Sequence, residues 1–309
     1  MPDPSAPRFS VLLPTHNRAD VVGVAIRSVL AQSEPDFELL VVGDGCTDAT
    51  AQVVAAFDDP RIRWFDLPKA PGFGYANRNV GLRQARGELI GFMAHDDIVL
   101  PDHLERMGRF FDDAHIDLAY SRPLWVTTDG IVVATATNLR NREDAAAFRR
   151  HNFAPASCIV HRRSCLERAG YWPEDVPTQG DWHLWKRIVR EDAGNVAYEP
   201  CPTALHFVAD WKRDRASLMP QVARMLAIVD TTDWWPASLR VDVSQAANEQ
   251  AAFARLMETD PGWTGRMRED VVLVLDRLAR SVLDGTMVDP RRRRRTLRAL
   301  RRLWARLSP

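Results

Sequence analysis

The first hundred residues alternate short apolar runs of strand length with segments that have helical periodicity. The apolar runs cover residues 9–13, 37–42 and 88–94, residues 61–65 are a further predicted strand, and the helical segments cover residues 19–30, 48–57 and 79–86. Alternation of this kind is typical of βαβ units, which build a parallel sheet covered by helices. The sequence therefore predicts an α/β fold.

The apolar run over residues 88–94 ends in His95-Asp96-Asp97, and a helix start follows at Pro101-Asp102. Open α/β sheets bind ligands at the carboxyl ends of their strands. Carboxylates placed there suit Mg²⁺ or Mn²⁺ carrying a substrate diphosphate. Asp is also common where a strand ends and where a helix begins, so the dipeptide alone leaves a metal site and a plain polar turn as alternatives.

Polar side chains also follow the first two predicted strands. Thr15, Asn17 and Arg18 come after the first strand, and Asp44 and Asp48 come after the second. Three polar strand ends at one edge of a parallel sheet describe a cleft of nucleotide size. No G-x-G-x-x-G follows the first strand and no G-x-x-x-x-G-K-[ST] occurs, so neither a Rossmann dehydrogenase nor a P-loop NTPase is favoured.

Composition limits the partners and the compartment. The 41 basic residues balance the 41 acidic residues of this 309-residue chain, so no overall field attracts nucleic acid. Cys46, Cys158, Cys165 and Cys201 have no zinc-site spacing, and we expect reduced thiols. The sequence has neither an apolar leader nor an apolar run of eighteen residues. These features predict a cytoplasmic protein without a nucleic-acid partner.

Five segments between residues 9 and 214 together resemble family 2 inverting glycosyltransferases, which have the GT-A fold. They are residues 11–18 (VLLPTHNR), 41–48 (VVGDGCTD), 77–82 (NRNVGL), 85–88 (ARGE) and 95–105 (HDDIVLPDHLE). The resemblance implies a Rossmann-like, mostly parallel sheet flanked by helices. It also implies transfer of a sugar from a nucleotide-sugar donor, most simply a UDP-sugar, to a hydroxyl group of a glycan or lipid-linked acceptor.

The resemblance assigns roles to residues at the strand ends. A buried Asp at position 44 that accepts from a base N–H would discriminate well, because the wrong base leaves the carboxylate unpaired. The guanidinium of Arg78 would suit the donor diphosphate; its alternative is a helix-face arginine in solvent. The implied nucleotide-sugar residues are Pro14, Thr15, Asn17, Asp44, Arg78, His95 and Asp96.

A divalent cation, Mn²⁺ or Mg²⁺, is the cofactor that the resemblance implies. Asp96 and Asp97 would hold it and offset the charge that builds on the departing diphosphate. His206 would be a further ligand; its alternative is a histidine satisfied at a strand end. His95 would supply a polar contact in place of a missing acid, or cap the turn.

Residues 179–187 (QGDWHLWKR) resemble the family segment whose Asp is the catalytic base, and Asp181 matches that Asp. Inverting transfer needs a carboxylate that takes the proton of the acceptor hydroxyl group. The alternative is an N-cap Asp on a helix whose Trp182, Leu184 and Trp185 belong to the core.

Three acids that the family usually has are absent, because Gly43, Ala94 and Gly180 stand in their places. Their loss keeps open a second interpretation, a non-catalytic GT-A protein that acts as a binding or scaffold module in glycan assembly. Each of the three motifs nevertheless retains another acid, which favours the enzyme over the scaffold module. A sugar-nucleotide pyrophosphorylase would need a glycine-rich loop with a basic residue near the N-terminus, which residues 11–18 lack.

The character of the chain changes at residue 216, so we predict a transferase domain over residues 1–215 and a helical extension over residues 216–309. The extension would pack on the transferase domain or form a homo-oligomer interface. Residues 291–309 contain nine arginines and no acid, and residues 296–307 form a basic amphipathic helix with one tryptophan. Such a helix is typical of a peripheral anchor on an anionic membrane; a solvated charge run and a helix docked on the acidic remainder are the alternatives.

Overall fold

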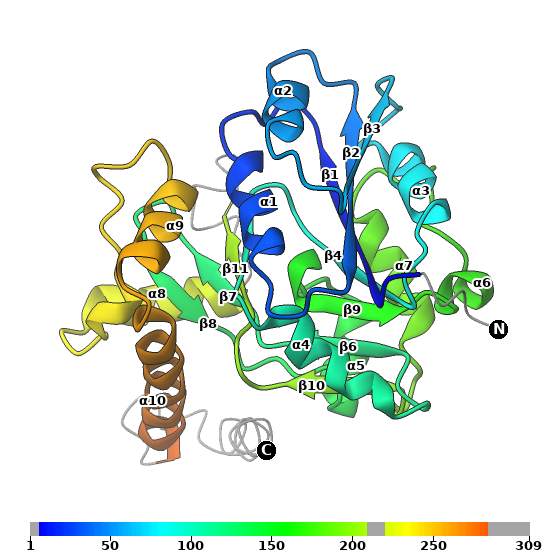
Figure 1. Ribbon diagram of the computed structural model, residues 1–309. Coiled ribbons are helices and arrows are strands. Elements are labelled where there is room, and N and C mark those ends of the chain that lie inside the picture. Colours follow the sequence, from blue (N-terminus) through cyan, green and yellow to red (C-terminus); the bar gives the residue numbers. More distant parts are fainter. Residues whose placement is uncertain (1–5, 209–219, 284–309) are drawn as a thin grey trace.

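The computed structural model describes residues 6–208 and 220–283, with side chains as far as residue 280. It shows a central sheet between helices and a group of C-terminal helices beside it (Figure 1). The predicted α/β class is confirmed.

The main sheet has seven strands in the order β10-β6-β9-β4-β1-β2-β3. They are β1 (Phe9–Thr15), β2 (Phe37–Asp44), β3 (Ile62–Leu67), β4 (Leu89–Phe92), β6 (Leu118–Ser121), β9 (Ile159–Arg162) and β10 (Val196–Glu199). β1 runs parallel to both β2 and β4, whereas β9 is antiparallel to β4 and β6. The four strands predicted near the N-terminus are all present, and the carboxyl ends of β1, β2 and β4 meet at one edge.

Helices cover both faces of this sheet, with α1 and α3 on opposite sides of β1 and β2 (Figure 1). Every residue of β2 is therefore buried, as expected for a parallel strand covered on both faces. The helices are α1 (Val22–Leu30), α2 (Thr50–Ala55), α3 (Tyr75–Arg83), α4 (His103–Gly108), α5 (Arg142–Phe148), α6 (Cys165–Ala169) and α7 (Gly180–Ile188), with the 3₁₀ turns η1 (Arg109–Asp112) and η2 (Ala156–Cys158).

A second sheet of four strands, in the order β5-β11-β7-β8, lies beside the first. Its strands are β5 (Ile98–Val99), β7 (Leu124–Val126), β8 (Val132–Ala134) and β11 (Ala204–Phe207). β7 and β8 form an antiparallel pair, with Leu124 opposite Ala134.

The helices of the extension pack on this second sheet. They are α8 (Pro220–Thr231), the 3₁₀ turn η5 (Ala237–Leu239), α9 (Glu249–Thr259) and α10 (Trp263–Leu283). Leu226, Phe253 and Met267 share one hydrophobic core with Leu124 and Val132. The division between residues 215 and 216 falls within residues 209–219, which lie outside the described residues, and it stays a prediction.

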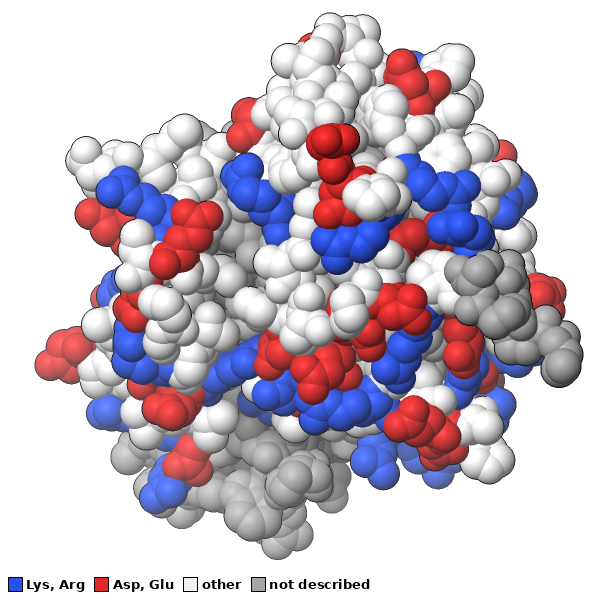
Figure 2. Space-filling view, viewed as in Figure 1, with Lys and Arg blue, Asp and Glu red and all other residues white. Residues whose placement is uncertain are grey.

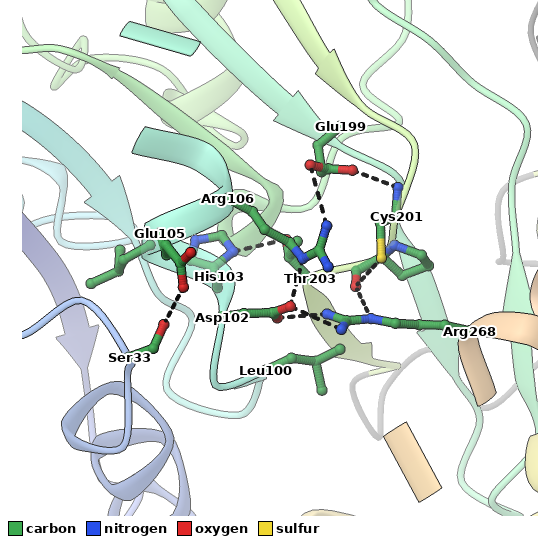
Figure 3. A network of polar contacts seen from close by, with 12 residues as sticks. Ser33, Leu100, Asp102, His103, Glu105, Arg106, Glu199, Cys201, Thr203 and Arg268 are labelled. Carbon is green, nitrogen blue, oxygen red and sulfur yellow. Dashed lines mark hydrogen bonds and ion pairs between the residues drawn. The ribbon is translucent and has the colours of Figure 1, made fainter. Parts of the chain in front are cut away.

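A polar network also joins α10 to the main body (Figure 3). Arg268 donates two hydrogen bonds to the carboxylate of Asp102, at 2.6 and 2.9 Å, and one to the carbonyl of Pro202 at 3.0 Å. Arg106 donates to the same carboxylate at 2.5 Å. Burial alone would raise the pKa of Asp102, but the two arginines outweigh it and lower the pKa to about 2.

The remaining predictions on chain organisation have mixed outcomes. All four cysteines lie in the described part and have free thiols, as predicted. Within the described ranges, none of the helices has the length and apolar character needed to span a bilayer. The basic segment over residues 291–307 lies outside the described residues. On the face shown in Figure 2, basic and acidic side chains are interspersed.

The Arg268–Asp102 pair gives a pH-dependent prediction. Replacing Arg268 with Met should lower the free energy of unfolding by about 2 kcal/mol at pH 7, since a half-buried carboxylate loses one of its two cationic partners. Because the pKa of folded Asp102 is depressed, its contribution is present above the unfolded value of about 3.9 and is lost as the pH falls toward 2. Urea unfolding should therefore show the deficit at pH 7 and a smaller one at pH 3.

Arg266 on the same helix is the matched control. Its side chain is 54% exposed and pairs with Asp260 inside the extension. The Arg266→Met variant should stay within about 0.5 kcal/mol of the wild type. Equal stability of the Arg268→Met variant and the wild type at pH 7 would contradict the role given to the network.

Candidate active site

A cavity of about 600 Å³ opens at the carboxyl ends of β1 and β4. The N-terminus of α7 and the loop over residues 152–156 close its other side. Its lining includes five of the residues predicted from the sequence, namely Pro14, Arg78, His95, Asp181 and His206. The structure therefore brings the predicted base, the predicted arginine and the late histidine to one cavity.

Asp181 lies in the first turn of α7, which begins at Gly180. Its Oδ1 accepts a hydrogen bond from the backbone N–H of Trp182 at 2.7 Å. The N-cap position belongs to Gln179, whose φ is +58°, so the interpretation of Asp181 as an N-cap residue is wrong. Burial raises the pKa of Asp181 and the charge of Arg78 partly opposes this shift. A carboxylate with a raised pKa in a cavity is suited to accepting a proton.

Arg78 is held between two aromatic rings and not extended into solvent. Its guanidinium carbon lies 5.1 Å from the ring centroids of both Tyr75 and Trp172. Its Nη1 donates to the carbonyl of Phe73 at 2.6 Å, and its buried Nε has no hydrogen-bond partner among the described residues. The buried amide of Asn79 fixes Trp172 by exchanging hydrogen bonds with its backbone, at 2.9 and 3.1 Å. The arginine is thus preorganised at the cavity wall with donor capacity for an anion.

Asp44 lies outside the lining of this cavity. Its carboxylate accepts hydrogen bonds from Lys69 Nζ at 2.5 Å, from the backbone N–H of Ala70 at 2.8 Å and from Asn77 Nδ2 at 2.6 Å. Burial opposes ionisation of Asp44, but these bonds outweigh it and lower its pKa. Gly74, at φ +74°, passes so close that a Cβ there would collide with the carboxylate. The sequence analysis missed Lys69, and its place shortly after the third strand is the only feature of the sequence that could have indicated it.

The two other residues predicted after β1 differ from each other. Thr15 is 3% exposed, and within the described part of the chain its hydroxyl has no hydrogen-bond partner. Asn17 instead connects the first two strand ends, because its Oδ1 accepts from the backbone N–H groups of Thr47 and Asp48 at 2.7 and 3.3 Å. The structure thus gives Asn17 a role in holding the loop, in addition to any contact with a donor.

Asp97 is fully buried and does not line the cavity. Its carboxylate accepts hydrogen bonds from Ser157 Oγ at 2.7 Å, His206 Nδ1 at 2.9 Å and the backbone N–H of Phe207 at 3.2 Å. These contacts do not support Asp97 as a direct metal ligand. They show a carboxylate that orients the imidazole of His206 at the cavity wall.

Asp96 lies beside Arg18 and His95, and of these three residues His95 alone lines the cavity. Its Oδ2 is 3.7 Å from Arg18 Nη1 and 4.0 Å from His95 Nε2. His95 donates from Nδ1 to the carbonyl of Pro14 at 3.2 Å, and its Nε2 lies 3.2 Å from Arg18 Nη1. Burial lowers the pKa of His95, so the ring is neutral at pH 7 and accepts from Arg18. The sequence places Arg18 among the polar residues after the first strand but assigns it no role; the structure pairs it with Asp96 and His95.

A divalent cation fits these residues only with help from a substrate. Among the described residues, no group of three or more His, Cys, Asp or Glu side chains is arranged to hold a metal ion. Mg²⁺ is commonly held by one or two carboxylates together with substrate phosphates, and a metal-binding histidine commonly donates its other N–H to a carboxylate. Asp96 and His206 meet these requirements, whereas Asp97 occupies the supporting position.

Aromatic rings occupy the space at two of the three positions where an acid is missing. A Cβ at Gly43 would lie under 3.0 Å from two atoms of the Trp64 ring. A Cβ at Gly180 would lie 2.9 Å from Cδ1 and Cε1 of Tyr75. The two glycines are therefore needed by the packing of this chain, and their presence does not indicate a damaged site.

Comparisons with known proteins agree with this geometry. The sequence model of the family described as "Glycosyl transferase family 2" matches residues 10–167. The "Succinoglycan biosynthesis protein ExoO" of Rhizobium meliloti (strain 1021) is 40% identical over 233 residues, which cover 72% of this chain and 66% of that protein. An uncharacterised glycosyltransferase of Haemophilus influenzae is 26% identical over 160 residues, covering 51% of this chain and 64% of that protein. The chain thus spans just under two thirds of these relatives.

Solved structures with the same fold include two glycosyltransferases. Staphylococcus aureus TarS 1-349 in complex with UDP-GlcNAc has a TM-score of 0.56 at 18% identity, with 97% of this chain and 88% of that chain covered. The mannosyltransferase PcManGT from Pyrobaculum calidifontis, in complex with GDP-Man and Mn²⁺, has a TM-score of 0.54 at 18% identity, with 99% and 88% covered. The predicted GT-A fold is confirmed.

The packing at the two glycines is testable by restoring the acids. The Gly43→Asp and Gly180→Glu variants should each lose about 1–3 kcal/mol of unfolding free energy, because the new side chains overpack against rings. Adding Trp64→Val to Gly43→Asp should recover part of the loss by opening the space. Chemical denaturation of the single and double variants measures both effects.

Gly91 in β4 is the control for this comparison. A Cβ there would meet its neighbours at 3.6–3.9 Å, which is ordinary van der Waals contact. Gly91→Ala should therefore cost less than either acid. If Gly43→Asp and Gly180→Glu were as stable as the wild type, the rings would not be the reason for the two glycines.

Proposed function

The chain belongs to glycosyltransferase family 2, and we propose that it is an inverting enzyme with Asp181 as its general base. The observation that carries the proposal is the half-buried Asp181 carboxylate, which shares one cavity with Arg78 and His206. Burial raises the pKa of this carboxylate, which strengthens it as a base.

The proposed reaction is a single displacement at the anomeric carbon of the donor sugar. The acceptor hydroxyl oxygen attacks from the face opposite the diphosphate, and Asp181 takes the hydroxyl proton. The bond between the anomeric carbon and the phosphate oxygen breaks as the new glycosidic bond forms, and the nucleoside diphosphate leaves. Arg78, at the same cavity wall, contributes positive charge toward the region where negative charge develops.

The proposed donor is a UDP-sugar that lies along the carboxyl ends of β1, β2 and β4. Thr15 supports this position, since its buried hydroxyl has no partner within the described structure. Asp44 supports a base with an N–H group, although Lys69 covers its carboxylate in this conformation. The solved TarS structure contains UDP-GlcNAc and the mannosyltransferase structure contains GDP-Man, so the choice between uracil and guanine needs a measurement.

The proposal includes a divalent cation held by Asp96, His206 and the donor diphosphate. Such a cation supplies Lewis-acid neutralisation of the leaving group when it is bound. Arg18, 3.7 Å from Asp96, holds the carboxylate near the donor end of the cleft.

The acceptor side of the proposal rests on the cavity and on the relatives. Phe73, Tyr75, Phe153 and Trp172 give the cavity aromatic walls, which suit a sugar acceptor. Because ExoO is described as a succinoglycan biosynthesis protein, we propose a glycan or lipid-linked acceptor in polysaccharide assembly. A cytoplasmic location and contact of residues 291–307 with an anionic membrane belong to the same proposal.

Asp181→Asn is the direct test of the base. The isosteric amide cannot accept the proton, so transfer should fall by at least about 100-fold while UDP affinity stays within about threefold. Product formation and calorimetric UDP binding measure the two quantities. Asp175→Asn, at an exposed acid shortly before α7, should leave both unchanged; loss of UDP binding in Asp181→Asn would make Asp181 a structural residue.

The pH profile of the wild type gives an independent test. Asp181 accepts a proton only when it is ionised, so the rate should fall as the pH drops through its pKa. Because that pKa is raised, the acid limb should lie above the value of about 3.9 of an ordinary Asp. An acid limb at or below that value, with the protein still folded, would exclude Asp181 as the base.

A further inference from the structure

The N-terminal turn of α9 contacts the loops that follow β1 and β4. Asn248 donates from Nδ2 to the carbonyl of Asp20 at 3.2 Å, and Gln250 donates from Nε2 to the carbonyl of Asp96 at 3.1 Å. Asp20 follows β1 and Asp96 follows β4. Figure 1 shows α9 beside α1, the helix that begins just after the first of these loops.

Arg18 lies in the first of these loops and joins it to the second. Its Nε lies 3.1 Å from Asp20 Oδ1, and its Nη1 lies 3.7 Å from Asp96 Oδ2 and 3.2 Å from His95 Nε2. The helix of the extension therefore contacts the two residues that Arg18 bridges. A movement of α9 would change the distance across which this arginine acts.

The side chains of Asn248 and Gln250 both make hydrogen bonds within the protein. Gln250 is only 6% exposed, and a buried amide requires partners. Asn248 uses both ends of its amide, since its Oδ1 accepts from the backbone N–H of Ala251 at 2.8 Å and caps α9. The same Asn248 amide therefore caps α9 and fixes the start of this helix to the loop that follows β1.

We propose that Gln250 and Asn248 are positioning residues, through which the helical extension holds Asp96 and Arg18 in the geometry that binds the donor diphosphate. The proposal rests on the proposed transferase function for its ligand. It adds that residues outside the segment matched by the family, 10–167, determine donor affinity. Arg268 supports the same segment from its far end by holding Asp102.

The test compares three variants of the full chain. Gln250→Met keeps the length and loses the donor, and we expect the dissociation constant for UDP with Mn²⁺ to rise about tenfold, as is typical for supporting residues of a metal site. Asn248→Ser keeps an N-cap side chain but does not reach Asp20, and its effect should be smaller and in the same direction. Arg255→Met, on the exposed face of α9, should bind UDP as the wild type does.

Hydrogen–deuterium exchange supplies a second measurement that needs no ligand. The backbone amides of residues 94–100 should exchange faster in Gln250→Met than in the wild type, while the strands of the main sheet stay unchanged. A lower melting temperature with unchanged UDP affinity and unchanged exchange at residues 94–100 would overturn the proposal and leave Gln250 a stability residue. If Gln250→Met does not fold, the Asn248→Ser variant decides by the same two measurements.

The outcomes also separate this inference from the proposed function. Failure of the wild type to bind UDP would contradict the proposed donor, whereas the exchange experiment would still decide whether α9 holds the loop after β4. Normal UDP binding by the wild type and by all variants would support the donor and overturn the positioning role.

Discussion

The buried carboxylate of Asp97 holds together the part of the molecule on which the site depends. It lies directly before β5, in the segment that follows β4, and accepts hydrogen bonds from Ser157, from the ring of His206 and from the backbone of Phe207. A buried charge is tolerated only when its hydrogen bonds are made. These bonds join the main sheet to β11 of the second sheet, on which the extension packs. The interaction therefore orients His206 at the cavity wall and ties together the parts of the fold between which the cavity lies.

The fold was largely predictable from the sequence, because period and composition directly reflect burial. The alternation of strand-length segments with helical segments predicted β1 to β4, and the burial of all eight residues of β2 explains the uninterrupted apolar run over residues 39–42. The association of the extension with the second sheet was less predictable. It depends on contacts such as Arg268 with Asp102, which lie 166 residues apart and have no local signature.

The sequence predicted the candidate site correctly for residues whose role does not depend on how their neighbours pack. Asp181, Arg78 and His206 do line one cavity. The prediction failed where the task depends on packing. Asp97 has the same chemistry as Asp96, but only the fold shows which of the two is buried and fully hydrogen-bonded. Packing also explains why the sequence left the missing acids unexplained. The sequence gives no indication that the rings of Trp64 and Tyr75 fill the space beside the two glycines.

We propose that this glycosyltransferase binds a uridine-diphosphate sugar with a divalent cation at the carboxyl ends of β1, β2 and β4. Calorimetric titration of the wild type with UDP, GDP, CDP and dTDP, each with Mn²⁺ and with EDTA, tests this proposal most directly. We expect UDP to bind most tightly and EDTA to weaken the binding. Absence of binding by any of the four diphosphates under either condition would contradict it.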